Sequence, residues 1–304
     1  MKHTILFLLV ALFLASCASP ATPTPTQTFT PAPPTFTPTF TFTPEPPTLT
    51  PTPTLGIGST EISPKDGMLL LYVPAGNFLM GSIASDPKAL ANEQPQHTVY
   101  LDAFWIDQTD VTNAMYAKCV SAGACNPPAQ LSSSTHSSYY GNSQFDNYPV
   151  INVTWDMANI YCSKWAGRQL PTEAQWEKAA RGPNGNMYPW GNNAPNTTLL
   201  NYYQNVGDTT EVGKYPNGAS PYGALDMAGN VWQWVADWYQ SGYYATLGNN
   251  ASNPQGPASG DVRVLRGGSW NDIINYFFVR SALRGRVDPT SWGAAFGFRC
   301  SRSQ

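Results

Sequence analysis

A tryptophan-rich segment at residues 225–238 constrains the fold of this chain more than any other stretch. Trp232, Trp234 and Trp238 fall within seven residues and alternate with Asp, Asn, Gln and a Gly-Asn step. Tryptophan buries a large apolar surface but needs a partner for its indole N–H, and a Gly-Asn step tolerates left-handed backbone. The segment therefore predicts a buried, irregular hub in which polar groups or a cation replace a regular hydrogen-bond ladder. The alternative is a tryptophan-rich strand within a core.

The amino-terminal segment is typical of an export signal. Lys2 supplies a positive charge, and residues 4–14 form a nearly unbroken apolar run that is too short for a permanent membrane span. The run ends in Leu14-Ala15-Ser16-Cys17, which resembles the bacterial lipobox, where cleavage precedes a cysteine that carries a diacylglycerol. We expect a signal peptide at residues 1–16 and a lipidated Cys17 that anchors an extracytoplasmic domain to the bacterial cell membrane. An ordinary secretory signal is the alternative.

Residues 17–62 are expected to form a disordered linker. Thr and Pro dominate residues 18–54, so the tract has too little apolar surface to fold, and its prolines favour extended polyproline II geometry. At roughly 3 Å per residue, such a linker holds a domain on the order of 100 Å from the membrane. The globular domain is expected at residues 63–304.

Four further cysteines fall within this domain. An even number in an exported protein predicts two disulfides, and four cysteines allow three pairings. Cys119 and Cys125 are separated by five residues, which favours a local bridge. That pairing leaves Cys162 to bond with Cys300.

The periodicity predicts short strands followed by three capped helices. Strands are expected at residues 68–73, 78–82 and 98–106. Helices are expected from Thr112 toward Val120, from Thr154 to a stop at Gly167, and from Thr172, with a capping box, to Gly182. Beyond Gly182 the chain is rich in turn signals, so loops and short strands are expected there.

Seven blocks of residues occur in order along the domain: Val73–Ser82, Asp107–Asn113, Pro149–Trp155, Arg168–Glu177, Tyr188–Gly191, Leu225–Trp238, and Arg266–Trp270 with Phe296–Cys300. Together they resemble the sulfatase-modifying-factor family, whose founding activity is the formylglycine-generating enzyme. The resemblance implies an α+β fold: a complex C-type-lectin-like fold with short strands, about three helices, much irregular loop, disulfides and structural calcium. It also places the family's long-range bridge on Cys162 and Cys300.

The resemblance implies two calcium sites. One consists of Asp226 and Gln233 with the carbonyls of Gly229 and Val231, and the other of Asn201 with Asp208. Oxygen ligands are those that Ca²⁺ prefers. The first set departs from the family pattern, because Gln233 replaces the usual glutamate. The alternative is that Asp226 and Asn201 only accept hydrogen bonds from backbone N–H groups in turns.

The family's oxidation of a cysteine uses Cu(I) held by two cysteines that follow its Arg-Gly-Gly-Ser segment, and soft thiolates suit that ion. The corresponding positions here are Asn271 or Asp272 and Tyr276 or Phe277, and no cysteine occurs between Ser269 and Arg280. We therefore expect no copper site. The family active-site segment falls on Ser269, Trp270, Asn271, Asp272 and Tyr276, with Ser269 as a turn residue.

Other redox chemistry is also not expected. Some relatives in this family are nonheme iron enzymes with histidine ligands, but only His97 and His136 lie in the domain, so a three-histidine site cannot be built. Each histidine is expected on a surface loop.

A ligand cleft is expected beside the active-site segment, lined by Trp232, Trp270, Asn271, Asp272, Arg280, Arg284 and Arg286. Aromatic rings with Asp and Arg suit a peptide, protein or glycan ligand, whereas Arg266 and Arg299 are expected to be structural. The net charge of −3 without a basic run excludes nucleic acid as an expected partner. The sequence thus favours a surface lipoprotein whose domain binds a ligand without catalysis. The alternative is a formylglycine-generating or other protein-modifying oxidase with a divergent active site.

Overall fold

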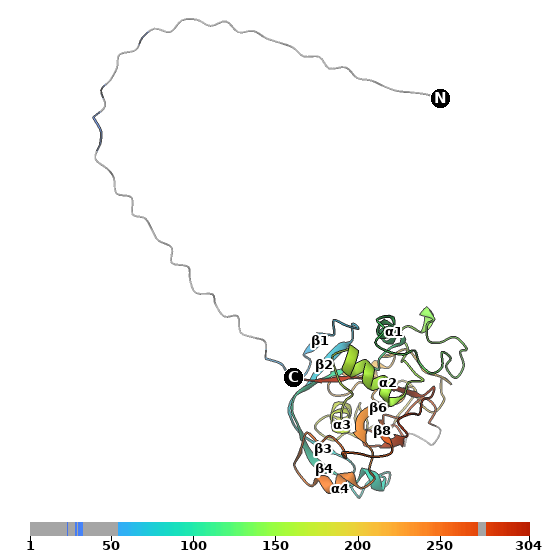
Figure 1. Ribbon diagram of the computed structural model, residues 1–304. Helices are drawn as coiled ribbons and strands as arrows, with labels where there is room; N and C mark the ends of the chain where they lie inside the picture. Colours follow the sequence, from blue (N-terminus) through green and yellow to red (C-terminus); the bar gives the residue numbers. More distant parts are fainter. Residues whose placement is uncertain (1–22, 24–27, 29, 33–53, 273–277) are drawn as a thin grey trace, which may run out of the picture. The chain divides into compact units, whose positions relative to one another are not determined.

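The computed structural model describes residues 23, 28, 30–32, 54–272 and 278–304. The domain that ends at Gln304 is a mixed α+β structure with long irregular connections (Figure 1), which agrees with the predicted class. Its strands are β1 (Thr60–Ile62), β2 (Leu69–Val73), β3 (Gly76–Met80), β4 (His97–Leu101), β5 (Phe104–Asp107), β6 (Trp232–Trp238), β7 (Ala251–Ser252), β8 (Arg263–Arg266), β9 (Gly285–Val287), β10 (Phe296–Phe298) and β11 (Ser301–Ser303). Its α-helices are α1 (Asn113–Ser121), α2 (Trp155–Ile160), α3 (Glu173–Arg181) and α4 (Tyr243–Leu247).

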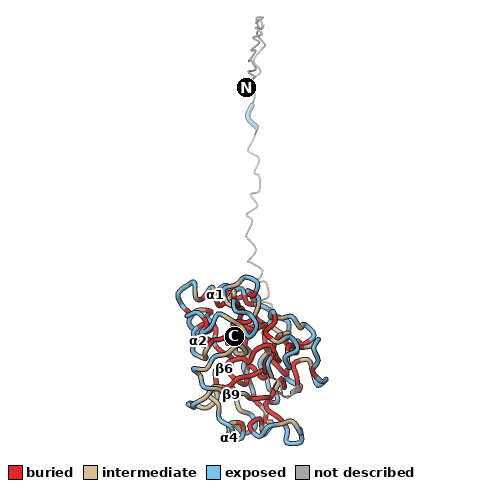
Figure 2. Tube along the Cα trace, turned by 90° about the vertical axis from the view of Figure 1, so that its right-hand side faces the viewer, coloured by how far each residue is buried: buried red, intermediate tan, exposed pale blue. Residues whose placement is uncertain are grey.

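Three small sheets are formed by strands that are distant in sequence. Their orders are β1-β2-β5-β11, β10-β6-β8-β9 and β3-β4-β7. The last two strands of the chain, β10 and β11, join different sheets, so the carboxyl-terminal segment ties the domain together. Buried residues run through the interior of the domain and include stretches of irregular chain such as residues 226–231, while exposed residues lie at its periphery (Figure 2).

The boundary predicted at residue 63 lies too late in the chain. β1 pairs with β2 in an antiparallel register, with Glu61 opposite Leu70, so folded structure begins inside the predicted 17–62 linker. β1 is only three residues long and largely exposed, and so it has no apolar alternation to reveal it. The strand predicted at residues 98–106 is two strands, because the chain leaves β4 after Leu101 and enters another sheet at Phe104.

The three predicted helices are confirmed with their caps. The hydroxyls of Thr112, Thr154 and Thr172 accept hydrogen bonds from the backbone N–H three residues later, and Thr172 forms the full capping box with Gln175. The second helix departs from α geometry after Ile160, where a π-helical turn (Tyr161–Trp165) follows α2. The short α4 was not predicted.

The tryptophan-rich segment combines the hub and the strand that the sequence offered as alternatives. Asp226, Gly229 and Asn230 have left-handed φ angles of 55°, 76° and 60°, so the first half is an irregular turn. From Trp232 the chain becomes β6, a buried strand paired with β8 on one side and with β10 on the other.

Both predicted disulfides are present. Cys119 bonds to Cys125 and Cys162 bonds to Cys300, with Cα–Cα distances of 5.4 and 5.7 Å. Within the described residues, no helix has both the length and the apolar character that a membrane crossing requires.

Candidate functional site

The two ends of the segment that follows β8 lie close together, at Gly268 and Phe278. Gly268 has a left-handed φ of 72°, and a Cβ at this position would lie 2.7 Å from the carbonyl oxygen of Phe278. Only glycine fits such an approach. The Arg266 guanidinium donates from the last residue of β8 to the carbonyl of Ser281. Both ends of the segment predicted to carry the family's active site are therefore fixed by the fold.

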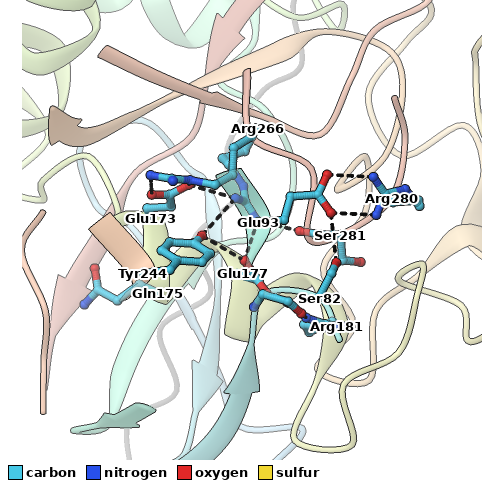
Figure 3. Close-up of polar contacts among 12 residues, drawn as sticks. Ser82, Glu93, Glu173, Gln175, Glu177, Arg181, Tyr244, Arg266, Arg280 and Ser281 are labelled. Carbon is cyan, nitrogen blue, oxygen red and sulfur yellow. Dashed lines mark hydrogen bonds and ion pairs between the residues drawn. The ribbon is translucent and has the colours of Figure 1, made fainter. Parts of the chain in front are cut away.

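Arg266 belongs to a buried network of ion pairs (Figure 3). Arg266 donates to Glu173 at 2.8 Å and to Glu177 at 2.7 Å, both on α3. Arg181 also donates to Glu177, at 2.8 Å. Burial raises the pKa of Glu177, but the Arg266 and Arg181 guanidinium groups outweigh it and hold the pKa below its ordinary value. The structural role predicted for Arg266 is therefore confirmed by its contacts.

Two arginines that were expected to line a ligand cleft are also buried and paired with glutamates. Arg284 is 3% exposed and donates to both carboxylate oxygens of Glu173, at 2.8 and 2.9 Å. Arg280 is 1% exposed and forms a bidentate pair with Glu93 at 2.8 and 2.6 Å (Figure 3). The placement of Arg284 in a ligand cleft was wrong, because its guanidinium is held by the buried Glu173 carboxylate. Arg280, although it is paired with the buried Glu93, does line a cavity of about 230 Å³.

Arg286, the third predicted cleft arginine, is exposed. It lies 4.8 Å from the ring centroid of Tyr239 and donates to that residue's hydroxyl. The three arginines thus have different main partners: Glu93 for Arg280, Glu173 for Arg284 and Tyr239 for Arg286, although Arg284 also lies over the Tyr239 ring, at 4.9 Å.

Ser269 and Asp272 form a compact turn. The Ser269 N–H and hydroxyl donate to the same Asp272 carboxylate oxygen at 2.6 and 3.1 Å, and the Asn271 N–H donates to the serine hydroxyl. Burial raises the pKa of Asp272, against hydrogen bonds from Ser269 and from Trp232. Ser269 therefore acts as a turn residue, and Trp232 hydrogen-bonds to the Asp272 side chain. Tyr276 lies outside the described residues.

Trp270 and Asn271 join this turn to two other parts of the chain. The Trp270 N–H donates to the Asn230 carbonyl at 3.0 Å, and its indole donates to the Ala294 carbonyl at 3.2 Å. Gln204 donates from its backbone to the Trp270 carbonyl at 2.7 Å and from its side chain to Asn271 at 2.9 Å. The hub, the Ser269–Asp272 turn and the loop around Gln204 therefore form one continuous site.

The hub does not fit the calcium set implied for Asp226 and Gln233. The Gln233 side-chain oxygen accepts from the Trp176 indole and from Arg299, each at 2.7 Å, and its amide nitrogen donates to the Asp226 carbonyl at 2.6 Å. One Asp226 carboxylate oxygen accepts from the Gly213 N–H at 2.7 Å. Gly229 and Val231 do lie in the predicted turn. The side-chain oxygen of Gln233, however, already accepts hydrogen bonds from two protein donors.

The second implied set retains an oxygen that a cation could use. The Asn201 side-chain oxygen is buried and accepts no hydrogen bond from any described residue, while its nitrogen donates to the Asp208 carbonyl at 2.8 Å. The Asp208 carboxylate accepts from Ser133, Thr135 and Thr209. Burial raises the pKa of Asp208, but these hydrogen bonds outweigh it and keep the pKa below its ordinary value. Among the described residues, no three His, Cys, Asp or Glu side chains gather as a metal site.

The histidines and cysteines of the described domain have defined structural partners. His97 is buried in β4, with its ring against Tyr244 and one nitrogen 3.0 Å from the Pro95 carbonyl, so its prediction as a surface-loop residue was wrong. His136 is exposed, as predicted, and its ring packs on that of Phe145. The four cysteines between residues 54 and 304 are all consumed by the two disulfides.

The loop around Gln204 was not predicted to belong to the site. One sequence signal was available: residues 191–207 contain no charged side chain and are rich in Asn, Thr and Tyr. The glutamate partners of the arginines had no comparable signal, since Glu93, Glu173 and Glu177 reach their partners from about 90 to 190 residues away.

Comparisons with known proteins agree over the domain. Residues 58–304 match the sulfatase-modifying factor enzyme 1-like domain. The serine/threonine-protein kinase pkn1 of Chlamydia caviae is 34% identical over 244 residues that cover 77% of this chain and 38% of the kinase, so the chain spans well under half of that protein. The formylglycine-generating enzyme of Streptomyces coelicolor is 33% identical, covering 78% of this chain and 90% of the enzyme. The structure of PvdO from Pseudomonas aeruginosa superposes with a TM-score of 0.69 at 23% identity, covering 83% of this chain and all of that one, which shows a shared fold.

We expect Arg266→Met to lower the free energy of unfolding by about 3–5 kcal/mol, because it leaves Glu173 and Glu177 buried with less positive charge. Urea unfolding followed by circular dichroism measures the change. Arg286→Met is the matched control, and as an exposed substitution it should change stability by no more than about 0.5 kcal/mol. Equal effects of the two substitutions would contradict a structural role for the Arg266 network.

Proposed function

The chain belongs to the sulfatase-modifying factor enzyme 1-like family, and from that premise we propose that it is a surface-anchored member that binds a ligand without oxidising cysteine. The ligand is a peptide, a protein or a glycan, and it binds on the surface formed by the Ser269–Asp272 turn and the neighbouring loop around Gln204. Lipidated Cys17 anchors the protein to the bacterial cell membrane, and the Thr/Pro-rich segment places the domain outside the cytoplasm.

One observation carries the proposal. The chemistry that the family uses on cysteine needs two thiolates, because soft sulfur ligands hold Cu(I). Every cysteine between residues 54 and 304 is in a disulfide, and the segment from Ser269 to Arg280 contains none. One of the expected thiol positions falls on Asn271 or Asp272, and the Asp272 carboxylate is bound to Ser269. The hard oxygen of a carboxylate does not replace a thiolate for this ion.

The site instead has the features of a recognition surface. Its backbone is fixed at the base by Gly268 and Arg266, and its polar groups are held by hydrogen bonds from the hub and from Gln204. A preorganised surface loses less conformational entropy when a ligand binds. The two disulfides support an extracytoplasmic location, since such bonds persist in oxidising compartments.

The alternative function is a formylglycine-generating or other protein-modifying oxidase with a divergent active site. The identity of 33% to a formylglycine-generating enzyme over most of its length favours it. Such an enzyme would have to oxidise its substrate without the protein thiols on which the family chemistry depends.

We expect no formylglycine when the full chain is incubated with a Cys-x-Pro-x-Arg peptide, copper and O₂, because no thiolate pair is present to bind Cu(I). Mass spectrometry of the peptide measures the product. The Streptomyces coelicolor enzyme, treated identically, is the positive control. Formylglycine made by this chain would overturn the non-catalytic function and establish the alternative.

The membrane anchor is tested by Cys17→Ser. We expect the wild-type chain, expressed in a bacterium with a lipoprotein-processing pathway, to fractionate with membranes, and the variant to lose the attached lipid and leave the membrane fraction. Metabolic labelling with a fatty acid and immunoblotting of the fractions measure both properties. A variant that stays in the membrane fraction would contradict anchoring through Cys17.

Structural calcium completes the proposal, and the geometry favours the Asn201–Asp208 set over the Asp226–Gln233 set. Asn201 would contribute its side-chain oxygen and Asp208 a carboxylate, which are the ligand types that a hard cation prefers. The ion would stabilise the loop on which the site is built.

After dialysis against EDTA, added Ca²⁺ should raise the unfolding temperature of the wild-type chain, since an ion that binds only the folded state stabilises it. Asn201→Leu should lose this increase and Asp226→Asn should retain it. Differential scanning fluorimetry measures the increase, with Mg²⁺ as the comparison ion. Loss in Asp226→Asn with retention in Asn201→Leu would assign calcium to the hub instead.

A further inference from the structure

Two consecutive residues beside the site have strained backbones. Tyr203 and Gln204 both have φ of 54°, in the left-handed region that favours glycine and asparagine. For a bulky residue such as tyrosine this conformation is uncommon. It persists only where the surrounding structure determines it.

Hydrogen bonds to the site hold this turn in place. Gln204 donates through its backbone to the Trp270 carbonyl and through its side chain to Asn271. The Tyr202 N–H donates to the Asn205 side chain at 3.2 Å, and the Asn205 N–H donates back to the Tyr202 carbonyl at 3.1 Å. The conformation at Gln204 thus serves to join the loop to the Ser269–Asp272 turn.

The same turn sets the backbone at Tyr203, because the Asn205 N–H to Tyr202 carbonyl hydrogen bond closes a turn whose two central residues both have positive φ. The turn does not require a tyrosine, however. Tyr203 is 54% exposed, and its ring centroid lies 6.4 Å from that of Tyr202. Glycine would adopt the same backbone without strain. A large aromatic ring kept in an unfavourable conformation and facing solvent is explained if the ring contacts a ligand.

The chemistry around Tyr203 is aromatic and amide-rich. No charged side chain occurs from Gly191 to Gly207, and Asn205 and Asn271 are exposed amides. Gln204 and Asn271 use one donor and one acceptor on each other, and among the described residues the Gln204 side-chain oxygen and the Asn271 amide nitrogen make no other hydrogen bond. Both groups are therefore available to a ligand that can accept and donate hydrogen bonds.

We propose that Tyr203 is a ligand-contacting residue and that the surface of Tyr203, Gln204 and Asn271 recognises an uncharged glycan. A sugar ring presents C–H groups on one face, which pack on an aromatic ring, and hydroxyls at its edge, which pair with amides. A charged peptide would leave its charge without a partner among these three residues. The inference rests on the proposed function and specifies its ligand class.

The test compares the full chain on an array of neutral oligosaccharides and on an array of peptides, with binding constants then measured by biolayer interferometry. Tyr203→Ala should weaken binding to the neutral oligosaccharides about tenfold, and Tyr203→Phe should retain it because the ring remains. Tyr203→Gly should weaken binding about as much as Tyr203→Ala does, and it should raise the unfolding temperature because it relieves the strained φ. Tyr100→Ala, which removes a 37%-exposed tyrosine on β4, is the matched control and should bind as the wild type does.

Each other outcome overturns a defined part of the inference. Oligosaccharide binding that is unchanged in Tyr203→Ala would exclude Tyr203 as a contact. Tyr203-dependent binding to peptides instead of sugars would exclude the glycan and leave the proposed function standing. No binding on either array would overturn the ligand class, while the formylglycine assay reports separately on the proposed function.

Discussion

One guanidinium group, that of Arg266, links the parts of the structure on which the site depends. It is fully buried at the end of β8 and donates to two glutamates of α3 and to the carbonyl of Ser281. A buried cation is tolerated when carboxylates balance its charge and most of its N–H groups are hydrogen-bonded; both terminal nitrogens of Arg266 have acceptors, whereas its Nε has none among the described residues. The helix α3, the strand β8 and Ser281 therefore meet at this guanidinium. Because these contacts of Arg266 are buried below the segment, they fix the base of the site independently of the side chains on its surface.

The hub shows a second constraint of the same kind. Gln233 accepts from Trp176 and Arg299 and donates to the Asp226 carbonyl. A glutamate could accept both hydrogen bonds but could not donate the third, because an ionised carboxylate has no proton to give. The glutamine that departs from the family pattern is therefore explained by its neighbours. It completes a network of protein groups at a point where the family pattern implies a metal ligand.

Features set by residues close in sequence were predicted well. The caps at Thr112, Thr154 and Thr172 and the Cys119–Cys125 bridge depend on spacings of six residues or fewer. The buried ion pairs were missed because their partners are distant in the chain, and an arginine gives no sign of which carboxylate it will meet. His97 was assigned to a loop because it continues a polar run and the predicted strand began at Thr98, one residue after the start of β4. The family resemblance supplied the fold and the location of the site, but the loop at Tyr203 could be found only from its contacts.

The proposed function requires a member of this family to keep the fold without the family's chemistry, and the separation between the buried base and the surface of the site is compatible with this requirement. A pair of copper-binding thiols would lie on the segment between Gly268 and Ser281, and the contacts that close this segment come from Gly268 and Arg266, outside the thiol positions. Asn271 or Asp272 stands where one thiol is expected, and neither side chain is a soft ligand; the Asp272 carboxylate is bound locally by Ser269. The loop around Gln204 bonds to Trp270 and Asn271. Under the proposed function, the surface residues can therefore change for recognition while the buried arginines and glutamates preserve the framework beneath them.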